Sequence, residues 1–163
     1  MLKKFIKKIF EYFGYKIISN KFPIDFTKSE IKLIQTVTNY TMTSPERIKT
    51  LIDSTNYITR NNIPGSIVEC GVWKGGSMMA AMLVLKLLKK TDRKFYLFDT
   101  FEGMSEPTDF DIDYEYKNAK NLLNINAKNK ENKIWGFSPI EDVKKNIYST
   151  NFSSENINFI KGK

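Results

Sequence analysis

The stretch that decides the fold is SIVECGVWKGGSMM, residues 66–79, and it is followed by KFYLFD, residues 94–99. It opens with a short β-branched run, typical of a strand, which leads into a turn that holds three glycines. An apolar run from Met78 to Leu88 then predicts a helix, and residues 94–99 have the composition of a second strand. A strand, a turn, a helix and a strand in this order predict a right-handed βαβ unit with parallel strands.

The sequence before and after this βαβ unit predicts further helices and a further strand. Residues 29–60 have helical periodicity, interrupted before Pro45, where Ser44 has the position and the side chain of a helix N-cap. Beyond the unit, Pro139 predicts the start of another helix, and residues 157–160 are a third run with strand composition. The sequence therefore predicts an α/β protein with a parallel sheet and flanking helices.

The composition excludes several kinds of chemistry. The chain has 163 residues, with 41% hydrophobic residues, one cysteine and no histidine. It therefore contains no Ser-His-Asp or Cys-His pair, no histidine-ligated zinc site and no disulfide within the chain. We expect a protein of a reducing compartment, which means a cytoplasmic location. Cys70, at the end of the first strand, is expected to be a buried and inert thiol.

The net charge of +8 is distributed unevenly along the chain. Residues 1–21 hold six lysines and one glutamate, whereas residues 99–116 hold seven acidic side chains and no basic one. Nucleic-acid binders usually concentrate basic charge in a patch among exposed aromatic rings, so we expect no nucleic-acid partner. The acidic stretch lacks the glycine and the terminal glutamate of an EF-hand, and we expect a solvated loop or a substrate lid there.

Apolar side chains in residues 2–13 recur at helical spacing, with lysines on the opposite face. Lysines interrupt every apolar run, so the pattern is not that of a signal peptide. We expect an amphipathic helix that ends near Gly14 and packs on the domain or on a partner. Contact of residues 2–13 with a membrane surface is the second interpretation, and it is not favoured because no lipidation motif accompanies them. A homo-oligomer is compatible with this pattern.

The glycine turn and the strand ends carry the candidate chemistry. A strand that leads through glycines into a helix presents backbone N–H groups to a ligand, and Gly71 and Gly75 let the backbone approach that ligand. The spacing is neither that of a GxGxxG turn nor that of a P-loop, which disfavours a nicotinamide-dependent oxidoreductase. Glu69 can receive the ammonium of an amino-acid moiety, and Asp99 can accept ribose hydroxyls. S-adenosylmethionine carries both groups.

Three longer strings point to a family: YTMTS at residues 40–44, IVECGVWKGGSMM at 67–79 and LFDTFEGMSEP at 97–107. In this order they closely resemble segments of the macrocin O-methyltransferase (TylF) family, and the resemblance extends from residue 40 to the end of the chain. It implies a Rossmann-like class I methyltransferase fold that uses S-adenosylmethionine and, typically, Mg²⁺ to methylate a hydroxyl group. The acceptors that it implies are small molecules such as sugars or other natural products.

The resemblance also implies where the cofactor lies. Its methionine end would meet Glu69 and Gly71, with the side chain of Ser77 nearby. Its ribose would meet Asp99, its adenosine would contact the loop that follows, and the segment around residue 42 would cover it. Trp73, in the turn, would shield the cofactor or pack in the core. The candidate cofactor-binding residues are therefore Met42, Thr43, Glu69, Gly71, Trp73, Gly75, Ser77, Asp99, Thr100, Phe101 and Gly103.

In this family the metal-binding aspartates and the catalytic base lie after the third strand, and the present sequence ends at Lys163. We therefore name no catalytic and no metal-binding residue, and we expect a fold truncated after the third strand, with an open edge at the first. The expected divisions are a basic N-terminal helix at 1–21, a helical cap region at 22–65 and the N-terminal half of the cofactor-binding domain at 66–163. The alternative function is a non-catalytic S-adenosylmethionine-binding fragment, or a module completed by a partner.

Overall fold

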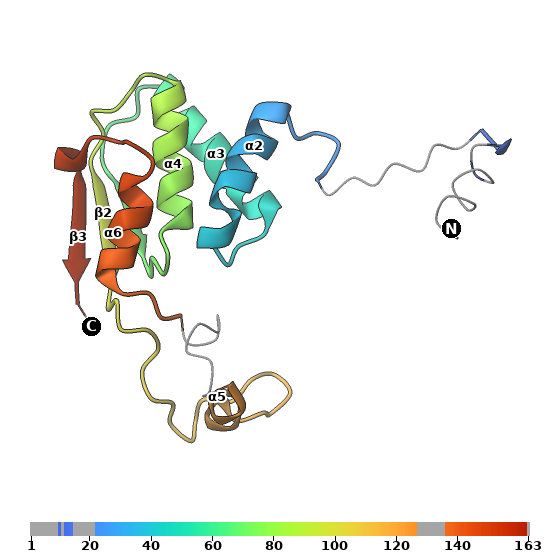
Figure 1. The fold of residues 1–163 in the computed structure, drawn as a ribbon, viewed down its shortest axis with the longest axis vertical. Coiled ribbons are helices and arrows are strands. Elements are labelled where there is room, and N and C mark those ends of the chain that lie inside the picture. Colours follow the sequence, from blue (N-terminus) through green and yellow to red (C-terminus); the bar gives the residue numbers. More distant parts are fainter. Residues whose placement is uncertain (1–9, 11, 15–21, 127–135, 163) are drawn as a thin grey trace.

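The computed structural model describes residues 10, 12–14, 22–126 and 136–162. Figure 1 shows a sheet with helices beside it and a segment around helix α5 that projects from the main body. The elements are α2 (Lys28–Val37), η1 (Thr38–Tyr40), α3 (Pro45–Arg60), β1 (Ile67–Cys70), α4 (Gly76–Leu87), β2 (Phe95–Asp99), α5 (Ala119–Asn126), α6 (Ile140–Tyr148), η3 (Ser154–Asn156) and β3 (Ile157–Lys161).

The three strands form one parallel sheet in the order β1-β2-β3. Ile67 of β1 pairs with Phe95 of β2, which in turn pairs with Ile157 of β3. The predicted βαβ unit is therefore confirmed, with α4 connecting β1 to β2, and the carboxyl ends of all three strands meet at one edge of the sheet. Strand β1 pairs with β2 on one side, and no strand in the described part of the chain pairs with its other side.

Helix α4 lies between the sheet and helices α2 and α3 (Figure 1). It is buried almost all round, and Met79 and Met82 are 2% and 0% exposed. A helix that is hydrophobic on every side needs packing partners on every side. The sheet supplies Phe95 and Leu97, both fully buried, and α3 supplies Ile48. The methionines of α4 are therefore core residues.

The other face of the sheet is open within the described residues. Successive side chains of a strand point to opposite faces, so Val68 and Cys70 of β1 lie on the face away from α4. Val68 is 54% exposed, Cys70 is exposed as well, and Phe98, which pairs with Cys70 on β2, is 38% exposed. The expectation of a buried Cys70 is therefore wrong, because none of the described helices packs on the face that carries it.

Helix positions mostly agree with the sequence, and Ser44 caps α3 by accepting a hydrogen bond from the N–H of Arg47 at 3.4 Å. Helix α4 begins earlier than predicted, because Gly75 takes a left-handed φ of 90° at the N-cap. Helix α5 forms in an asparagine- and lysine-rich stretch for which no helix was expected. The helix predicted at 1–21 lies almost entirely outside the described residues. None of the described helices is both long and apolar enough to cross a membrane.

Gly76 is the point at which the segment before α3 touches the start of α4. A Cβ atom at Gly76 would lie 2.5 Å from the carbonyl oxygen of Tyr40 and 2.7 Å from Cβ of Thr41. We predict that Gly76→Ala lowers the free energy of unfolding by about 1–3 kcal/mol, because the backbone must shift, whereas Gly→Ala in a helix ordinarily raises it. Urea unfolding followed by circular dichroism measures the change. Gly162→Ala, where a Cβ has open space, is the control; a stability raised by Gly76→Ala would contradict the clash.

Candidate functional site

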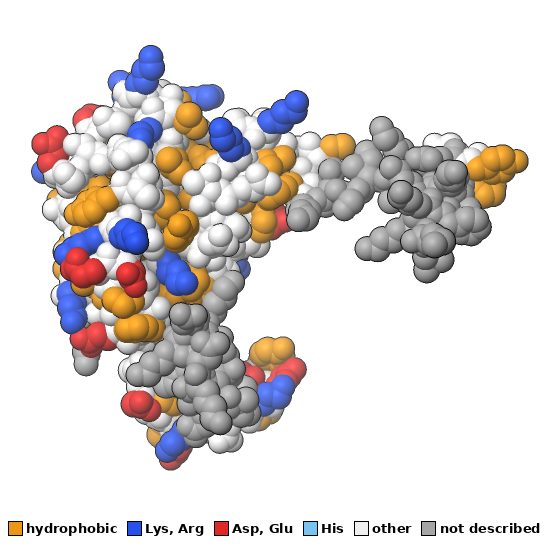
Figure 2. All heavy atoms as spheres, in the orientation of Figure 1, with side chains coloured by type: hydrophobic (Ala, Val, Ile, Leu, Met, Phe, Trp, Pro, Cys, Tyr) orange, Lys and Arg blue, Asp and Glu red, His pale blue; other side chains and the backbone are white. Residues whose placement is uncertain are grey.

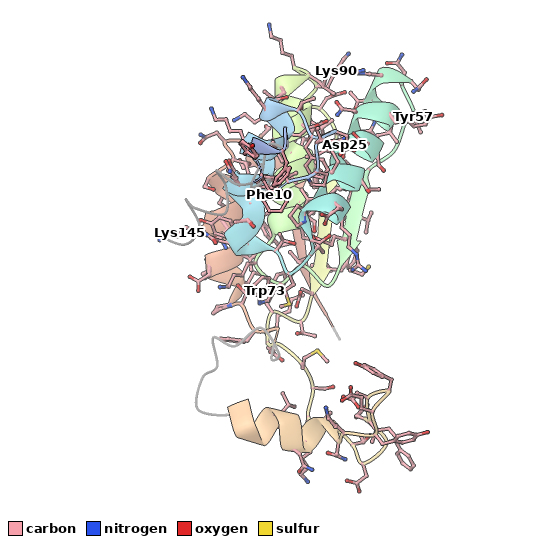
Figure 3. All side chains as sticks on the ribbon, turned by 90° about the vertical axis from the view of Figure 1, so that its right-hand side faces the viewer. Phe10, Asp25, Tyr57, Trp73, Lys90 and Lys145 are labelled. Atoms are coloured by element: carbon pink, nitrogen blue, oxygen red, sulfur yellow. The ribbon has the colours of Figure 1, made fainter. Side chains whose placement is uncertain are left out.

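A cavity of about 580 Å³ opens at the carboxyl ends of the three strands. In an open α/β sheet ligands bind at this edge, because the turns that follow the strands leave a crevice there. Figure 3 shows Trp73 at this end of the main body, on the side of the projecting segment. The lining residues are Tyr40, Thr41, Met42, Thr43, Glu69, Gly71, Val72, Trp73, Gly76, Ser77, Phe98, Asp99, Thr100, Gly103, Met104, Gly136, Ile160 and Gly162.

Most of the candidate residues line this cavity, but two do not. Phe101 is 5% exposed and its ring belongs to the hydrophobic core. Gly75 is buried, and a Cβ there would meet Ile147 of α6 at 2.9 Å. The structure brings the other nine together at the cavity: Met42, Thr43, Glu69, Gly71, Trp73, Ser77, Asp99, Thr100 and Gly103.

The cavity also contains residues that the sequence did not single out. Tyr40, Val72 and Gly76 lie within or beside the quoted strings. Ile160 of β3 and Gly162, which follows β3, come from a distant part of the chain. The parallel order of the strands was the signal that could have found this last pair, because residues after every strand of such a sheet meet at the same edge.

Glu69, the third residue of β1, has an unusual environment. Its Oε2 atom is buried and has no hydrogen-bond partner among the described residues. Burial raises the pKa of Glu69 to about 7, the negative charge of Asp99 adds to this rise, and the hydroxyl of Ser77 acts against it. Buried polar atoms without a partner are rare, and a perturbed acid in a cleft marks a candidate ligand-binding group.

The carboxylate of Asp99, at the end of β2, joins the two turns that border the cavity. Its Oδ2 accepts hydrogen bonds from the backbone N–H groups of Val72 at 2.6 Å and Trp73 at 3.0 Å. Its Oδ1 accepts from the N–H of Phe101 at 2.8 Å and from the hydroxyl of Thr100 at 3.5 Å. The sequence suggested only a ligand-binding role for Asp99, so this structural role was missed.

The backbone of the glycine turn is in an unfavourable conformation, which the hydrogen bonds to Asp99 help to hold. Gly71 has a φ of 87°, and Trp73, which is not a glycine, has a φ of 48°. Left-handed backbone is unfavourable for a residue with a Cβ, and it persists only where neighbouring bonds enforce it. The hydrogen bond from Trp73 to Asp99 is one such bond. The turn is therefore fixed in the protein alone, before any ligand binds.

Comparisons with known proteins agree with this geometry. The family model of macrocin O-methyltransferase (TylF) matches residues 5–162. Mycinamicin III 3''-O-methyltransferase of Micromonospora griseorubida is 33% identical over 72 residues, which are 44% of this chain and 28% of that protein. The 8-demethyl-8-(2,3-dimethoxy-alpha-L-rhamnosyl)-tetracenomycin-C 4'-O-methyltransferase of Streptomyces olivaceus is 36% identical over 67 residues, 41% of this chain and 26% of that protein.

A solved structure, that of the O-methyltransferase NovP, superimposes with a TM-score of 0.57 at 24% identity. The match covers 76% of this chain and 47% of NovP. This likeness confirms the predicted fold, a Rossmann-like parallel sheet with flanking helices. The chain spans less than half the length of the proteins named here.

The bonds of Asp99 lead to a prediction about stability. Asp99→Ala leaves three backbone N–H groups without their acceptor, and we expect the free energy of unfolding to fall by about 2–4 kcal/mol. Urea unfolding measures the change. Asp113→Ala is the matched control, because Asp113 also accepts from two backbone N–H groups but lies in an exposed loop. Equal losses in the two variants would contradict the assigned role of Asp99.

The raised pKa of Glu69 makes stability depend on pH. The folded protein holds the proton up to about pH 7, whereas the unfolded chain loses it near 4.5. The stability contributed by the protonated group is therefore complete below pH 4.5 and lost as the pH rises through about 7. Glu69→Gln has no such proton, so its stability relative to the wild type should rise by up to about 3 kcal/mol between pH 4.5 and 8.

Urea unfolding at pH 5 and at pH 8 measures this difference. Glu106→Gln, at an exposed carboxylate, is the control and should show no such rise. A stability difference between Glu69→Gln and the wild type that stays constant across this range would contradict the assignment.

Proposed function

Because the chain belongs to the macrocin O-methyltransferase family, we propose that its cavity binds S-adenosylmethionine and that the chain contributes the cofactor-binding part of an O-methyltransferase. The observation that carries this proposal is the buried, unpartnered oxygen of Glu69 at the cavity. The acceptor that we propose is a hydroxyl group of a sugar or another natural product. The relatives support it by name, since they are O-methyltransferases of mycinamicin III and of a rhamnosyl-tetracenomycin.

Glu69 is suited to the ammonium group of the cofactor. An ammonium has three donors and a positive charge, so it satisfies the unpartnered Oε2 atom and stabilises the ionised carboxylate in its buried position. The turn from Gly71 presents its backbone to the same space, because a Cβ at Gly71 would meet nothing within 4 Å. Ser77, in the first turn of α4, also lines this part of the cavity. We assign the methionine end of the cofactor to these three residues.

The ribose and adenosine belong to the loop after β2. The Oδ1 atom of Asp99 accepts one short bond and one at 3.5 Å, so it keeps an acceptor position for a ribose hydroxyl. Thr100 is held by a hydrogen bond from its hydroxyl to the carbonyl of Gly103 at 3.2 Å, which gives the adenosine an ordered wall. Met42, 46% exposed at the cavity, and Thr43 would cover the cofactor from the other side.

Two candidate residues receive indirect roles in this proposal. Phe101 acts through its backbone N–H, which holds Asp99, while its ring anchors the loop in the core. Gly75 acts through its left-handed backbone, which starts α4 directly after the turn. Trp73 is half-buried at the cavity and would exclude water from the cofactor.

When bound, S-adenosylmethionine supplies a methyl group that transfers in line to an acceptor oxygen. The contribution of the described residues is to bind and orient this donor, and orientation is a large part of such a rate enhancement. We assign removal of the acceptor proton to none of them. Mg²⁺ is proposed from the resemblance alone, since the described residues contain no cluster of three side chains able to hold a metal ion.

The non-catalytic alternative is not favoured. The family and the relatives named above are O-methyltransferases. A nicotinamide-dependent oxidoreductase has no support from them either. We also propose a cytoplasmic location, because a lone cysteine suits a reducing compartment.

The ammonium assignment is tested by isothermal calorimetry with two ligands that differ at one end. S-adenosylhomocysteine carries the amino-acid group, and 5′-methylthioadenosine lacks it. We predict that Glu69→Gln weakens binding of S-adenosylhomocysteine by about 10- to 100-fold, because a charge-assisted hydrogen bond is lost, and leaves 5′-methylthioadenosine unaffected. Glu106→Gln is the control for both ligands. Equal weakening for both ligands would show that Glu69 acts on the fold, and no weakening for either would remove it from the site.

A further inference from the structure

The acidic loop, which we define as residues 104–116, exposes aromatic rings that no described part of the chain covers. Phe110, Tyr114 and Tyr116 are 93%, 90% and 85% exposed, and Ile112 is 51% exposed. Figure 2 shows hydrophobic and acidic side chains side by side on the segment that projects below the main body. Single exposed rings are ordinary, whereas a group of them marks an interaction surface.

The loop holds this arrangement through its own hydrogen bonds. Oδ2 of Asp111 accepts from the N–H and the hydroxyl of Thr108 at 2.7 and 2.9 Å. Oδ1 of Asp113 accepts from the N–H groups of Glu115 and Lys117 at 2.8 and 2.9 Å. The rings are therefore presented by a structured loop, and the surface exists before a partner binds.

The partner that fits this surface is both basic and apolar. The acidic loop contains five acidic side chains and no basic one. Those of Glu106 and Asp109 are exposed and have no hydrogen-bond or ion-pair partner in the ranges that the structure describes. Complementary charge across an interface steers association and selects the partner.

The N-terminal segment of the same chain has this chemistry. Residues 1–14 contain four lysines and one glutamate, interleaved with leucine, isoleucine and phenylalanine. Its described part is exposed, with Phe10, Tyr12 and Phe13 at 45%, 87% and 68%. The ring of Tyr12 packs edge-on against that of Phe13, with 5.5 Å between the centroids. The described rings of a basic apolar segment and the rings of an acidic apolar loop are therefore both exposed in one chain.

We propose that the acidic loop of one copy of this chain binds the N-terminal segment, residues 1–14, of a second copy. Within a single chain the described residues of the two surfaces do not cover one another, because the rings of Tyr12 and Phe13 and those of the loop all stay exposed. In a dimer with twofold symmetry each copy gives one segment and receives one, so the same contact forms twice and the assembly closes. This contact does not depend on the cofactor assignment.

Paired charge reversals test the contact in the full chain. The first variant carries Lys3→Glu, Lys4→Glu, Lys7→Glu and Lys8→Glu, and the second carries Glu106→Lys, Asp109→Lys and Glu115→Lys, which makes the net charge of the acidic loop positive. Each variant alone sets like charges against each other, and we expect dimer dissociation constants at least about tenfold higher than that of the wild type. Mixed in equal amounts, the two variants have opposite charges at both contacts, so the heterodimer should form. Size-exclusion chromatography with light scattering at low ionic strength measures the masses.

Asp25→Lys with Asp92→Lys and Glu155→Lys is the matched control, because it changes the net charge by as much as the second variant does, at exposed acidic residues elsewhere. It should dimerise like the wild type, and circular dichroism should show the same fold for all variants. A monomeric wild type would overturn the proposal. So would variants that dimerise as well as the wild type, or a mixture that stays monomeric, the result expected if each segment bound the loop of its own chain.

Discussion

The carboxylate of Asp99 connects the end of β2 to the turn between β1 and α4, and the cavity depends on this connection. Parallel pairing sets Cys70 opposite Phe98, so the residues after β1 arrive beside the residue that ends β2. The carboxylate of Asp99 can then accept hydrogen bonds from backbone N–H groups in the turn after β1 and in the turn after β2. Because the same turn starts α4, and α4 packs on the sheet, α2 and α3, a local set of hydrogen bonds fixes the edge of the whole core.

Whereas the carboxylate of Asp99 stabilises the fold, that of Glu69 destabilises it. A buried carboxylate with an unpartnered oxygen destabilises the fold, and the pKa of Glu69, raised to about 7, reports that cost. The core around α4 tolerates it because most of its contacts are apolar and well buried. A group that weakens the protein alone and is satisfied by a cationic ligand makes binding and folding reinforce each other, since a ligand that binds only the folded state stabilises it.

The sequence predicted the βαβ unit well, because its signals are local: a β-branched run, glycines at a turn and an apolar helix. It also identified half of the residues that line the cavity, from the glycine turn, the strand ends and the strings that resemble a known family. The sequence did not predict which side chains are buried where that burial depends on elements far apart in the chain. Cys70 was expected to be buried, but the described helices pack on the other face of β1. The ring of Phe101 follows the strand end like its neighbours, yet it turns into the core, which no local pattern reveals.

Met104 joins the two surfaces described above. It lines the cavity at the strand ends and is the first residue of the acidic loop. If a second copy binds the loop and contacts Met104, the dimer constrains a side chain that forms part of the cavity wall. Coupling of this kind is reciprocal, so a ligand in the cavity must shift dimerisation by the same factor by which dimerisation shifts its affinity. On these two proposals, cofactor binding and assembly are linked through Met104, although each depends on different residues.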